Sequence, residues 1–303
     1  MRPEIEQVVQ LIQRKDPKSL EEALALLQTT VFSFSMKVCG QRQDAEDTMQ
    51  EVLFKSIPYL PKFDSPKALM VWLYKVAKNR CLMSRRRSNF APTEALSLEE
   101  LMPDRKELEK LSGNPDATPE TLLLRRESAK RLREAVQKLP PAYRLILVLH
   151  DMEDLSDNDI AEITGLRSGT IRVRLHRARL FIRKELASQD DPGVRRKIAK
   201  AAVHGPAQPR HRRCKEMFAE LSNYLDDELD DSLCEELQKH MEGCAPCNTF
   251  LSSLERTIQS CRTATNGQPD PRVAAKLRRE LLSGYQELMT KIIKRETNKA
   301  NRI

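Results

Sequence analysis

The sequence predicts an all-α fold, in which two small helical domains joined by a flexible linker precede a small helical C-terminal domain. Charged residues make up 32% of the 303 residues and aromatic residues 5%, a helix-rich composition with few strand signals. Apolar residues recur at helical spacing through most of the chain. Stretches rich in proline and charge interrupt this pattern, and the length suits two or three domains.

Bulk properties restrict the class of protein further. The formal net charge of +8 favours a polyanionic partner. No apolar run follows a basic N-terminus and no stretch of about eighteen apolar residues occurs, so we expect a cytoplasmic protein without a membrane span. Seven cysteines is an odd number, and without a secretion signal it favours metal ligands or free thiols over disulfides.

Residues 4–38 predict a core-forming pair of helices that is separated at Pro17 and Ser19. Residues 43–57 predict a third helix with two distinct faces. Its inward-pointing residues are Ala45, Met49, Val52 and Leu53. Asp44, Asp47 and Glu51 share another face, which suits docking against a basic partner helix, although the charge pattern alone favours an ordinary solvated face.

A fourth helix is predicted over Ala68–Arg87 and carries the only tryptophan of the chain, Trp72. Together with Phe63, Tyr74 and a basic rim, Trp72 could line a surface for unstacked bases, because aromatic and cationic side chains together hold single strands. The alternative is that Trp72 is simply a core residue. The basic rim consists of Lys75, Lys78, Arg80, Arg85, Arg86 and Arg87.

Residues 120–151 predict two helices, Glu120–Lys138 and Ala142–Asp151, that close the core behind a helix-turn-helix. The first helix of that motif is predicted over Ser156–Thr164, with Ser156 as its N-cap. Gly165 supplies the residue of positive φ that ends it.

The second helix of the motif begins near Ser168 and has one apolar stripe and a basic outer face. From Arg167 to Lys184 there are seven basic residues and no acidic one. A short turn, one buried stripe and a basic face are typical of a helix that enters a DNA major groove. The alternative is a solvated basic helix packed on a small domain.

The predicted recognition helix supplies the candidate DNA contacts. N-terminal residues of such a helix reach base edges. We therefore assign base reading to Ser168, Thr170, Val173 and Arg177. Phosphate contacts are assigned mainly to Arg167, Arg172, Arg174 and Arg179. His176 is placed opposite the core, and we expect it to pack or to contact a phosphate rather than to bind a metal.

Two blocks of the chain resemble one protein family. Residues 44–51 (DAEDTMQE), followed by residues 72–80 (WLYKVAKNR), are similar to regions 2.1 to 2.4 of the extracytoplasmic-function (ECF) sigma factors. Residues 139–144 (LPPAYR) and 169–179 (GTIRVRLHRAR) resemble region 4 of that family. Two positions depart from the family pattern, since Met83 replaces an acidic residue and Val173 replaces a common serine.

The resemblance implies a transcription initiation factor that binds RNA polymerase core and promoter DNA. It implies that the helix face of Asp44, Asp47, Gln50 and Glu51 binds the polymerase clamp helices. It further implies that residues 63–87, with Asn79 among them, melt and read the minus-10 element, and that region 4 reads the minus-35 element.

Residues 89–119 are expected to form an acidic linker, because residues 92–120 contain eight acidic and three basic residues. Such a segment does not pack a core by itself. The family reading is that it follows the RNA exit path of polymerase, and the alternative is a plain tether. Residues 188–212 are expected to form a second, positively charged linker.

A metal site is predicted in the C-terminal third. His240-x3-Cys244-x2-Cys247 has the spacing of zinc ligands at the end of a helix. Cys214 is the preferred fourth ligand, with Cys234 and His211 as alternatives. With a leading cysteine and a Tyr-Leu-Asp-x-Glu-Leu stretch, the region resembles the zinc-binding anti-sigma domain. The other cysteines are expected to be ordinary small apolar residues: Cys39, Cys81 and Cys261.

Charge suggests what this region does. Residues 220–242 contain nine acidic and one basic residue, whereas the recognition helix is entirely basic. One hypothesis is that the C-terminal domain folds back and masks a DNA-binding or polymerase-binding surface, and the alternative is a merely stabilising acidic domain. A second hypothesis is thiol sensing, in which oxidation of Cys244 and Cys247 ejects zinc. Residues 271–303 predict a basic amphipathic helix, for which a protein contact ranks above a membrane surface.

These observations divide the chain into six parts. The predicted domains and linkers are 1–88, 89–119, 120–187, 188–212, 213–262 and 263–303. The alternative function is a helix-turn-helix regulator that acts without core polymerase, but it explains neither the acidic helix face nor the Trp72 helix. An enzyme is not expected, because the chain lacks a Gly-rich phosphate loop and a nucleophile elbow, and a four-coordinate zinc leaves no open position.

Overall fold

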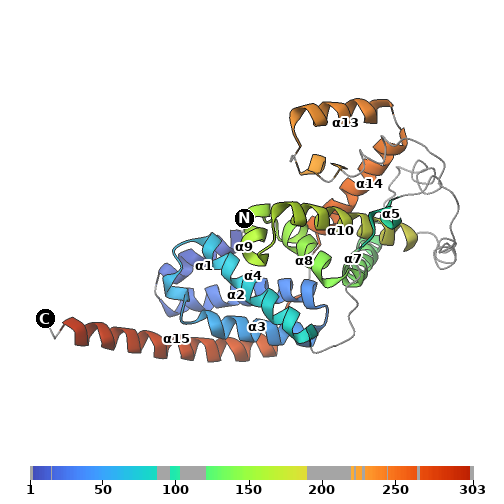
Figure 1. The fold of residues 1–303 in the computed structure, drawn as a ribbon. Coiled ribbons are helices and arrows are strands. Elements are labelled where there is room, and N and C mark those ends of the chain that lie inside the picture. The colour runs from blue at the N-terminus through green and yellow to red at the C-terminus, as the bar shows by residue number, and fades with distance from the viewer. Residues whose placement is uncertain are drawn as a thin grey trace.

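The computed structural model describes residues 3–14, 16–86, 96–102, 121–189, 220–221, 223–226, 229–243, 245–264 and 267–300. Every regular element within these ranges is a helix, which confirms the all-α fold class. Figure 1 shows the described helices as two adjoining lobes, with two C-terminal helices beside the second lobe and the last helix along the first.

The first lobe contains the N-terminal helices. Its elements are α1 (Pro3–Gln13), α2 (Pro17–Cys39), α3 (Arg42–Ser56), the 3-10 turn η1 (Leu60–Lys62) and α4 (Pro66–Arg86). The break between the first two helices directly precedes Pro17, as predicted, whereas Ser19 lies within α2. Asp16 caps α2 by accepting a hydrogen bond from the Ser19 amide at 2.9 Å, and Pro17 occupies the first turn, where its missing N–H costs nothing.

The second lobe contains the helix-turn-helix. Its elements are α7 (Thr121–Lys138), α8 (Pro141–Leu147), the π-helical turn η2 (Val148–Met152), α9 (Asp157–Thr164) and α10 (Ser168–Gln189). The predicted caps of α9 are confirmed. The Ser156 hydroxyl accepts from the Asp159 amide at 3.2 Å, and Gly165 ends the helix with a φ of +75°.

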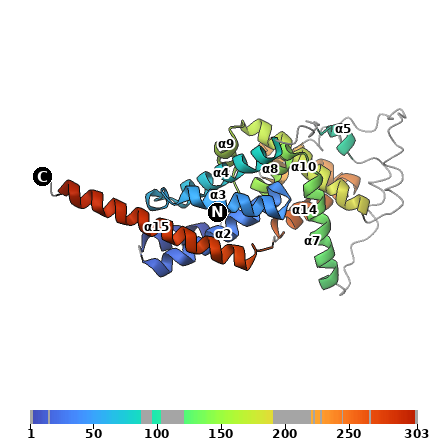
Figure 2. The same cartoon turned by 90° about the horizontal axis from the view of Figure 1, so that it is seen from below.

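The C-terminal module comprises residues 220–221 and 223–226 and three helices, and a short linker helix lies beside it. The helices of the module are α13 (Asp231–Gly243), α14 (Ala245–Arg262) and α15 (Pro271–Ala300), and the linker helix is α5 (Leu98–Leu101). Figures 1 and 2 agree that α15 runs alongside α2 and α3 and extends beyond the first lobe. The predicted C-terminal helix therefore packs on the first lobe.

One hydrophobic cluster runs through both lobes and into the module. It includes the fully buried Cys261 of α14 and Leu281 of α15. A second cluster joins α10, α13 and α14 to the linker residue Leu101. The two lobes and the module are therefore held together by continuous apolar burial, which is the main stabilising term of a fold.

Gly40 lies at the seam between the lobes and ends α2 with a φ of +82°. A Cβ atom at this position would lie 2.0 Å from Oε1 of Gln137, which belongs to α7. That same oxygen accepts a hydrogen bond from the buried Arg144 at 2.7 Å, and Arg144 also donates to the Val38 carbonyl at 3.0 Å. The seam therefore requires glycine both for the backbone conformation and for the close approach.

The structure corrects one expectation about the cysteines. Cys39 and Cys81 form a disulfide that joins α2 to α4, although both were expected to be ordinary small apolar residues. Their Cα atoms lie 5.5 Å apart, within the range that a disulfide bridges. They are 42 residues apart in sequence, so only the packing of α2 against α4 reveals the pair. Cys261 is a buried free thiol, as expected.

Candidate nucleic-acid interface and metal centre

The acidic face of α3 is solvent-accessible, with Asp47 exposed and Asp44, Gln50 and Glu51 partly exposed. Glu51 forms ion pairs at 2.7 Å with Lys55 and with Arg80 of α4. The hydrogen bond from Lys55 and the charge of Arg80 lower the pKa of Glu51, against the opposing effect of burial. Glu51, a candidate polymerase contact, and Arg80, a candidate DNA contact, thus neutralise each other's charge across two adjacent helices.

An aromatic surface lies beside this face. Trp72 is half-buried, and its ring lies 5.7 Å from that of Tyr59 and 5.9 Å from that of Phe63. Tyr59 is 47% exposed, and Lys62 lies over its ring at 5.8 Å. Tyr59 was not singled out from the sequence, since it lies in the turn before α4. The sequence feature that could have indicated its exposure is its position between two prolines, in a turn that also contains lysine and phenylalanine.

Tyr74 does not belong to this surface, and its assignment there was wrong. It is 1% exposed, packs against Phe34 with a centroid distance of 4.6 Å, and donates a hydrogen bond to Glu153 at 2.5 Å. Residues two apart on a helix point about 200° apart. Trp72 and Tyr74 therefore cannot share a face of α4.

The basic rim of α4 is partly occupied by α9 of the second lobe. Lys75 and Asn79 are exposed, whereas Lys78 donates to the Ile163 carbonyl at 2.8 Å. Burial, with a contribution from the charge of Lys75, lowers the pKa of Lys78. Lys67 pairs with Asp159 at 2.6 Å. The side chains of Arg85 and Arg86 lie outside the described residues.

A buried ion pair closes the two lobes on each other. Glu153, which follows η2, is 1% exposed. It accepts hydrogen bonds from Lys37 of α2 at 2.8 Å and from Tyr74 of α4. Removing one partner of a buried pair leaves the other charge uncompensated, which is strongly destabilising. Sequence reasoning did not single out Glu153, because its partners lie more than seventy residues away.

The N-terminal half of α10 presents its side chains to solvent. Arg167 and Thr170 are exposed, Ser168 and Arg174 are partly exposed, and Val173 is 51% exposed. Arg172 is partly exposed and pairs with Asp157 at 3.1 Å, at the start of α9. These candidate base and phosphate contacts therefore remain on the surface of the described structure.

The middle of α10, from Leu175 to Arg183, is largely buried, which corrects the placement of His176. His176 is 6% exposed rather than opposite the core, because α5 and α14 pack on α10 in addition to α7 and α8. Burial, with the charges of Arg179 and Arg177, lowers the pKa of His176 to about 4. Arg177 is partly exposed and donates to the carbonyl of Leu96 in the linker at 3.1 Å.

Arg179, assigned to a phosphate contact, is fully buried in this structure. It donates to Asp151 of η2 at 2.9 and 2.6 Å and to Asp226 of the C-terminal module at 2.7 and 2.8 Å. Burial would raise the pKa of Asp151, but the charge and hydrogen bonds of Arg179 bring it to about 2. Asp226 thus holds the module on the helix-turn-helix by an ion pair with the buried Arg179.

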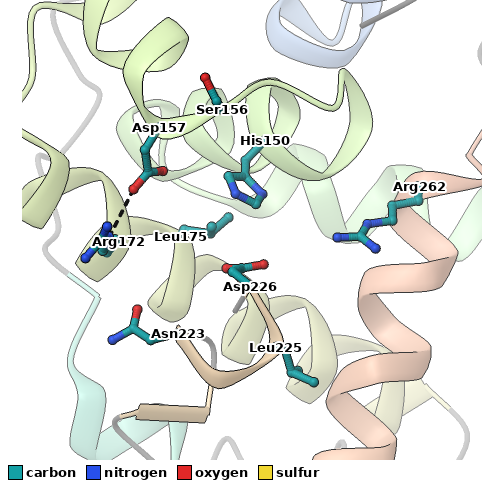
Figure 3. A pocket seen from close by; sticks show the side chains of 9 residues that line it. All are labelled: His150, Ser156, Asp157, Arg172, Leu175, Asn223, Leu225, Asp226 and Arg262. Atoms are coloured by element: carbon teal, nitrogen blue, oxygen red, sulfur yellow. Dashed lines mark hydrogen bonds and ion pairs between the residues drawn. The ribbon is translucent and has the colours of Figure 1, made fainter. Parts of the chain in front are cut away.

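Two further features mark this contact. Arg183 is 2% exposed, and its guanidinium lies 4.4 Å from the centroid of the Phe250 ring in α14. A polar cavity of about 350 Å³ lies beside Asp226 and is lined also by His150 of the second lobe and Arg262 of α14. Figure 3 shows how these side chains lie around it.

Two of the four predicted metal ligands lie together. Nε2 of His240 lies 3.3 Å from Sγ of the buried Cys247. Two ligands of one tetrahedral zinc, at ordinary Zn–N and Zn–S lengths, are separated by roughly 3.5 Å. These two side chains therefore fit a shared zinc ion. Cys214, Cys244 and His211 lie outside the described residues, within which no three metal-binding side chains converge, and Cys234 is a half-buried free thiol.

The chain matches three family models. They are "Sigma-70 region 2" over residues 25–90, "Sigma-70, region 4" over residues 129–182 and "Putative zinc-finger" over residues 214–248. The first match contains all of α3 and α4, and the second contains α9 and most of α10. A helix-turn-helix regulator that acts without polymerase would not account for region 2.

Several curated proteins are similar to the chain over about three-fifths of its length. The ECF sigma factor SigW of Bacillus subtilis is 24% identical over 60% of this chain and 96% of the relative. The sigma-H factor of Pseudomonas aeruginosa is 29% identical over 60% and 93%, and the ECF sigma-E factor of Escherichia coli is 27% identical over 57% and 88%. The solved structure of the sigma factor RpoE with the anti-sigma factor NepR from Bartonella quintana is 22% identical over 56% of this chain and 97% of that chain, with a TM-score of 0.39.

Regions 2 and 4, in this order, define the chain as a sigma factor, a transcription initiation factor of RNA polymerase and not an enzyme. More particularly, it belongs to the ECF sigma factors, and its residues 214–248 match the zinc-finger family model. Within the described residues, none of the helices combines the length and apolar character needed to cross a bilayer.

Proposed function

We propose that this sigma factor is restrained in cis by its zinc-binding C-terminal module. In the unrestrained state, region 2 binds the clamp helices of core polymerase through the acidic face of α3 and reads the minus-10 element with α4. Region 4 reads the minus-35 element with the N-terminal half of α10. The place of action is the cytoplasm, where core polymerase and promoter DNA are found.

The observation that carries the proposal is that the module contacts both lobes. On the second lobe, Asp226 pairs with the buried Arg179. On the first lobe, Gln28 of α2 donates to the Ala274 carbonyl of α15 at 2.9 Å and accepts from Arg278 at 3.3 Å. Cys261 of α14 is buried in the hydrophobic cluster that runs through both lobes. A module fixed at both ends favours the closed arrangement of the lobes.

The mode of restraint follows from what remains exposed. The base-reading residues Thr170 and Val173 are accessible, so the module does not act by covering them. Lys78, by contrast, is engaged by α9, and α15 lies along α2 and α3. We infer that the closed arrangement of the lobes, together with α15, prevents the chain from binding polymerase and both promoter elements at the same time.

Zinc is proposed to be held by Cys214, His240, Cys244 and Cys247. When bound, the ion would pin α13 to α14 and so preserve the surface that presents Asp226 and Phe250. Thiolates bind zinc only while they are reduced. Oxidation of Cys244 and Cys247 would therefore release the restraint, which makes thiol sensing the favoured form of regulation.

Run-off transcription with purified core polymerase tests the proposal. The templates are genomic fragments, and transcript starts are mapped by sequencing. The full chain is compared with a chain that lacks residues 205–303 and with the Cys244→Ser, Cys247→Ser double variant. Both altered chains should start transcription more efficiently at the same sites. Unchanged or lower activity would count against restraint in cis, and zinc that stays bound while peroxide changes activity would count against thiol sensing.

A further inference from the structure

We propose that linker residues 96–102 form a strap that holds the C-terminal module on α10, so that docking of the linker and docking of the module are one cooperative contact. This inference rests on the proposed restraint in cis and adds a third participant to it. The strap connects the two sigma regions in sequence, yet the described structure places it against the surface that α10 and α14 form together.

Apolar burial is the first argument for the strap. Leu101 is 5% exposed and shares a cluster with Leu180 of α10 and Phe250 of α14. Leu96, Leu98 and Met102 are partly buried against the same cluster. An acidic tether with no docking role would leave these side chains in water. Because each partner contributes to one cluster, loss of the strap exposes apolar surface on both α10 and α14.

Hydrogen bonds fix the strap along the helix-turn-helix lobe. The Leu96 amide donates to the Tyr143 hydroxyl of α8 at 3.2 Å. The Leu96 carbonyl accepts from Arg177 of α10 at 3.1 Å, and the Glu100 carbonyl accepts from Lys184, two turns further along α10. Two helices of region 4 therefore hold the strap: α8 accepts from the Leu96 amide, and α10 donates to backbone carbonyls near both ends of the strap.

Charge complementarity explains why this segment suits this helix. Residues 96–102 contain two acidic residues and no basic one, whereas residues 167–184 contain seven basic residues and no acidic one. The strap therefore places negative charge near a helix whose basic face suits the phosphate backbone of DNA. Arg177, a candidate base-reading residue, is already engaged by the strap, so full use of that arginine by promoter DNA requires the strap to leave.

Hydrogen exchange on the full chain tests the coupling directly, without transcription. Leu101→Ser should speed exchange at the amides of α14 by about tenfold or more, since a buried leucine side chain is lost from the shared cluster. Reciprocally, Asp226→Ala should speed exchange within residues 96–102, because coupling between two docked elements acts in both directions. Leu101→Met, which keeps the apolar volume, should leave both regions protected. Unchanged exchange of α14 in Leu101→Ser would overturn the inference.

The unaltered chain provides a second test that does not depend on how the variants fold. The amides of Leu101 and Met102, which donate to Ser97 and Leu98, should exchange more slowly in the full chain than in a synthetic peptide of residues 93–105. Tyr143→Phe removes the acceptor of the Leu96 amide and should raise exchange there while α9 stays unchanged. Equal exchange in chain and peptide would overturn the strap.

Run-off transcription separates this inference from the proposed restraint. Asp226→Ala and Leu101→Ser should each raise the transcript yield, and the double variant should exceed the stronger single variant only slightly, because both break one contact. If Asp226→Ala has no effect, the restraint in cis is wrong, whatever the strap does. If Asp226→Ala activates and Leu101→Ser does not, the restraint stands and the strap alone is overturned.

Discussion

At the scale of single residues, a few buried charges determine how the lobes and the module meet. Glu153 joins α2 and α4 to the second lobe, and Arg179 joins the second lobe to the module. Both side chains are essentially withdrawn from solvent. Buried charges of this kind stabilise the fold only while their partners are in place.

Glu153→Gln should be strongly destabilising. The substitution keeps the side-chain shape but leaves Lys37, which is 4% exposed, without its negative partner. We expect a loss of about 3–5 kcal/mol in the free energy of unfolding, measured by urea denaturation. Glu185→Gln is the matched control, because the Lys138–Glu185 pair is on the surface and should contribute less than about 1 kcal/mol. Equal losses in the two variants would contradict this account of Glu153.

His176 makes stability depend on pH. Burial, with Arg179 and Arg177, lowers its pKa from 6.5 to about 4. Between these values the unfolded chain binds a proton that the folded chain does not, so this contribution is present above pH 6.5 and is lost as the pH falls towards 4. The loss amounts to at most about 3 kcal/mol. Denaturation at pH 7, 6 and 5 should show a smaller decline for His176→Gln than for the unaltered chain, and parallel declines would refute this role.

Residues whose roles depend on near neighbours in sequence were predictable, and those with distant partners were not. Ser156 and Gly165 cap α9 as predicted, since both signals act within one turn. Tyr74 and His176 were misplaced, because their burial depends on Glu153, α5 and α14, which no local pattern connects to them. The contact between His240 and Cys247 agrees with their spacing, whereas the other ligands stay predictions.

At the scale of elements, the disulfide between α2 and α4 gives the first lobe a covalent link. Closing a loop of 42 residues restricts the unfolded chain and is worth about 2–4 kcal/mol. The oxidised chain should therefore unfold at higher urea than the reduced chain. The Cys39→Ser, Cys81→Ser variant should show no such difference, and Cys234→Ser is the control that keeps it. A difference that persists in the double variant would place the effect at other thiols.

Helix positions followed from apolar periodicity and from proline breaks, and the described bounds of α2, α4 and α10 lie close to the predicted ones. The short helix α5 was not expected. Four residues are too few to give a periodic signal. The acidic composition of the linker predicted an unpacked segment, so its leucines were not taken as core residues. What a helix docks on was also not predictable for α15, because an amphipathic stripe specifies burial but not the partner.

At the scale of the whole molecule, α15 reaches the lobe farthest from it in sequence and should weaken polymerase binding. Arg278→Glu breaks its hydrogen bonds to the buried Gln28 and should raise the affinity of the full chain for core polymerase, measured by fluorescence anisotropy. Arg279→Glu makes the same charge change at an exposed neighbour and should have little effect. If Arg278→Glu and Arg279→Glu bind core polymerase with the same affinity, docking of α15 does not limit polymerase binding.

The order of the parts along the chain has a consequence for its synthesis. The ribosome completes both promoter-reading regions by the end of α10, while residues 190–303 are still to be made. At bacterial elongation rates this interval is on the order of ten seconds. Under the proposed restraint, a newborn chain therefore passes through a period in which regions 2 and 4 are complete but the restraining module is not. The polymerase concentration then determines how many copies are recruited during that time.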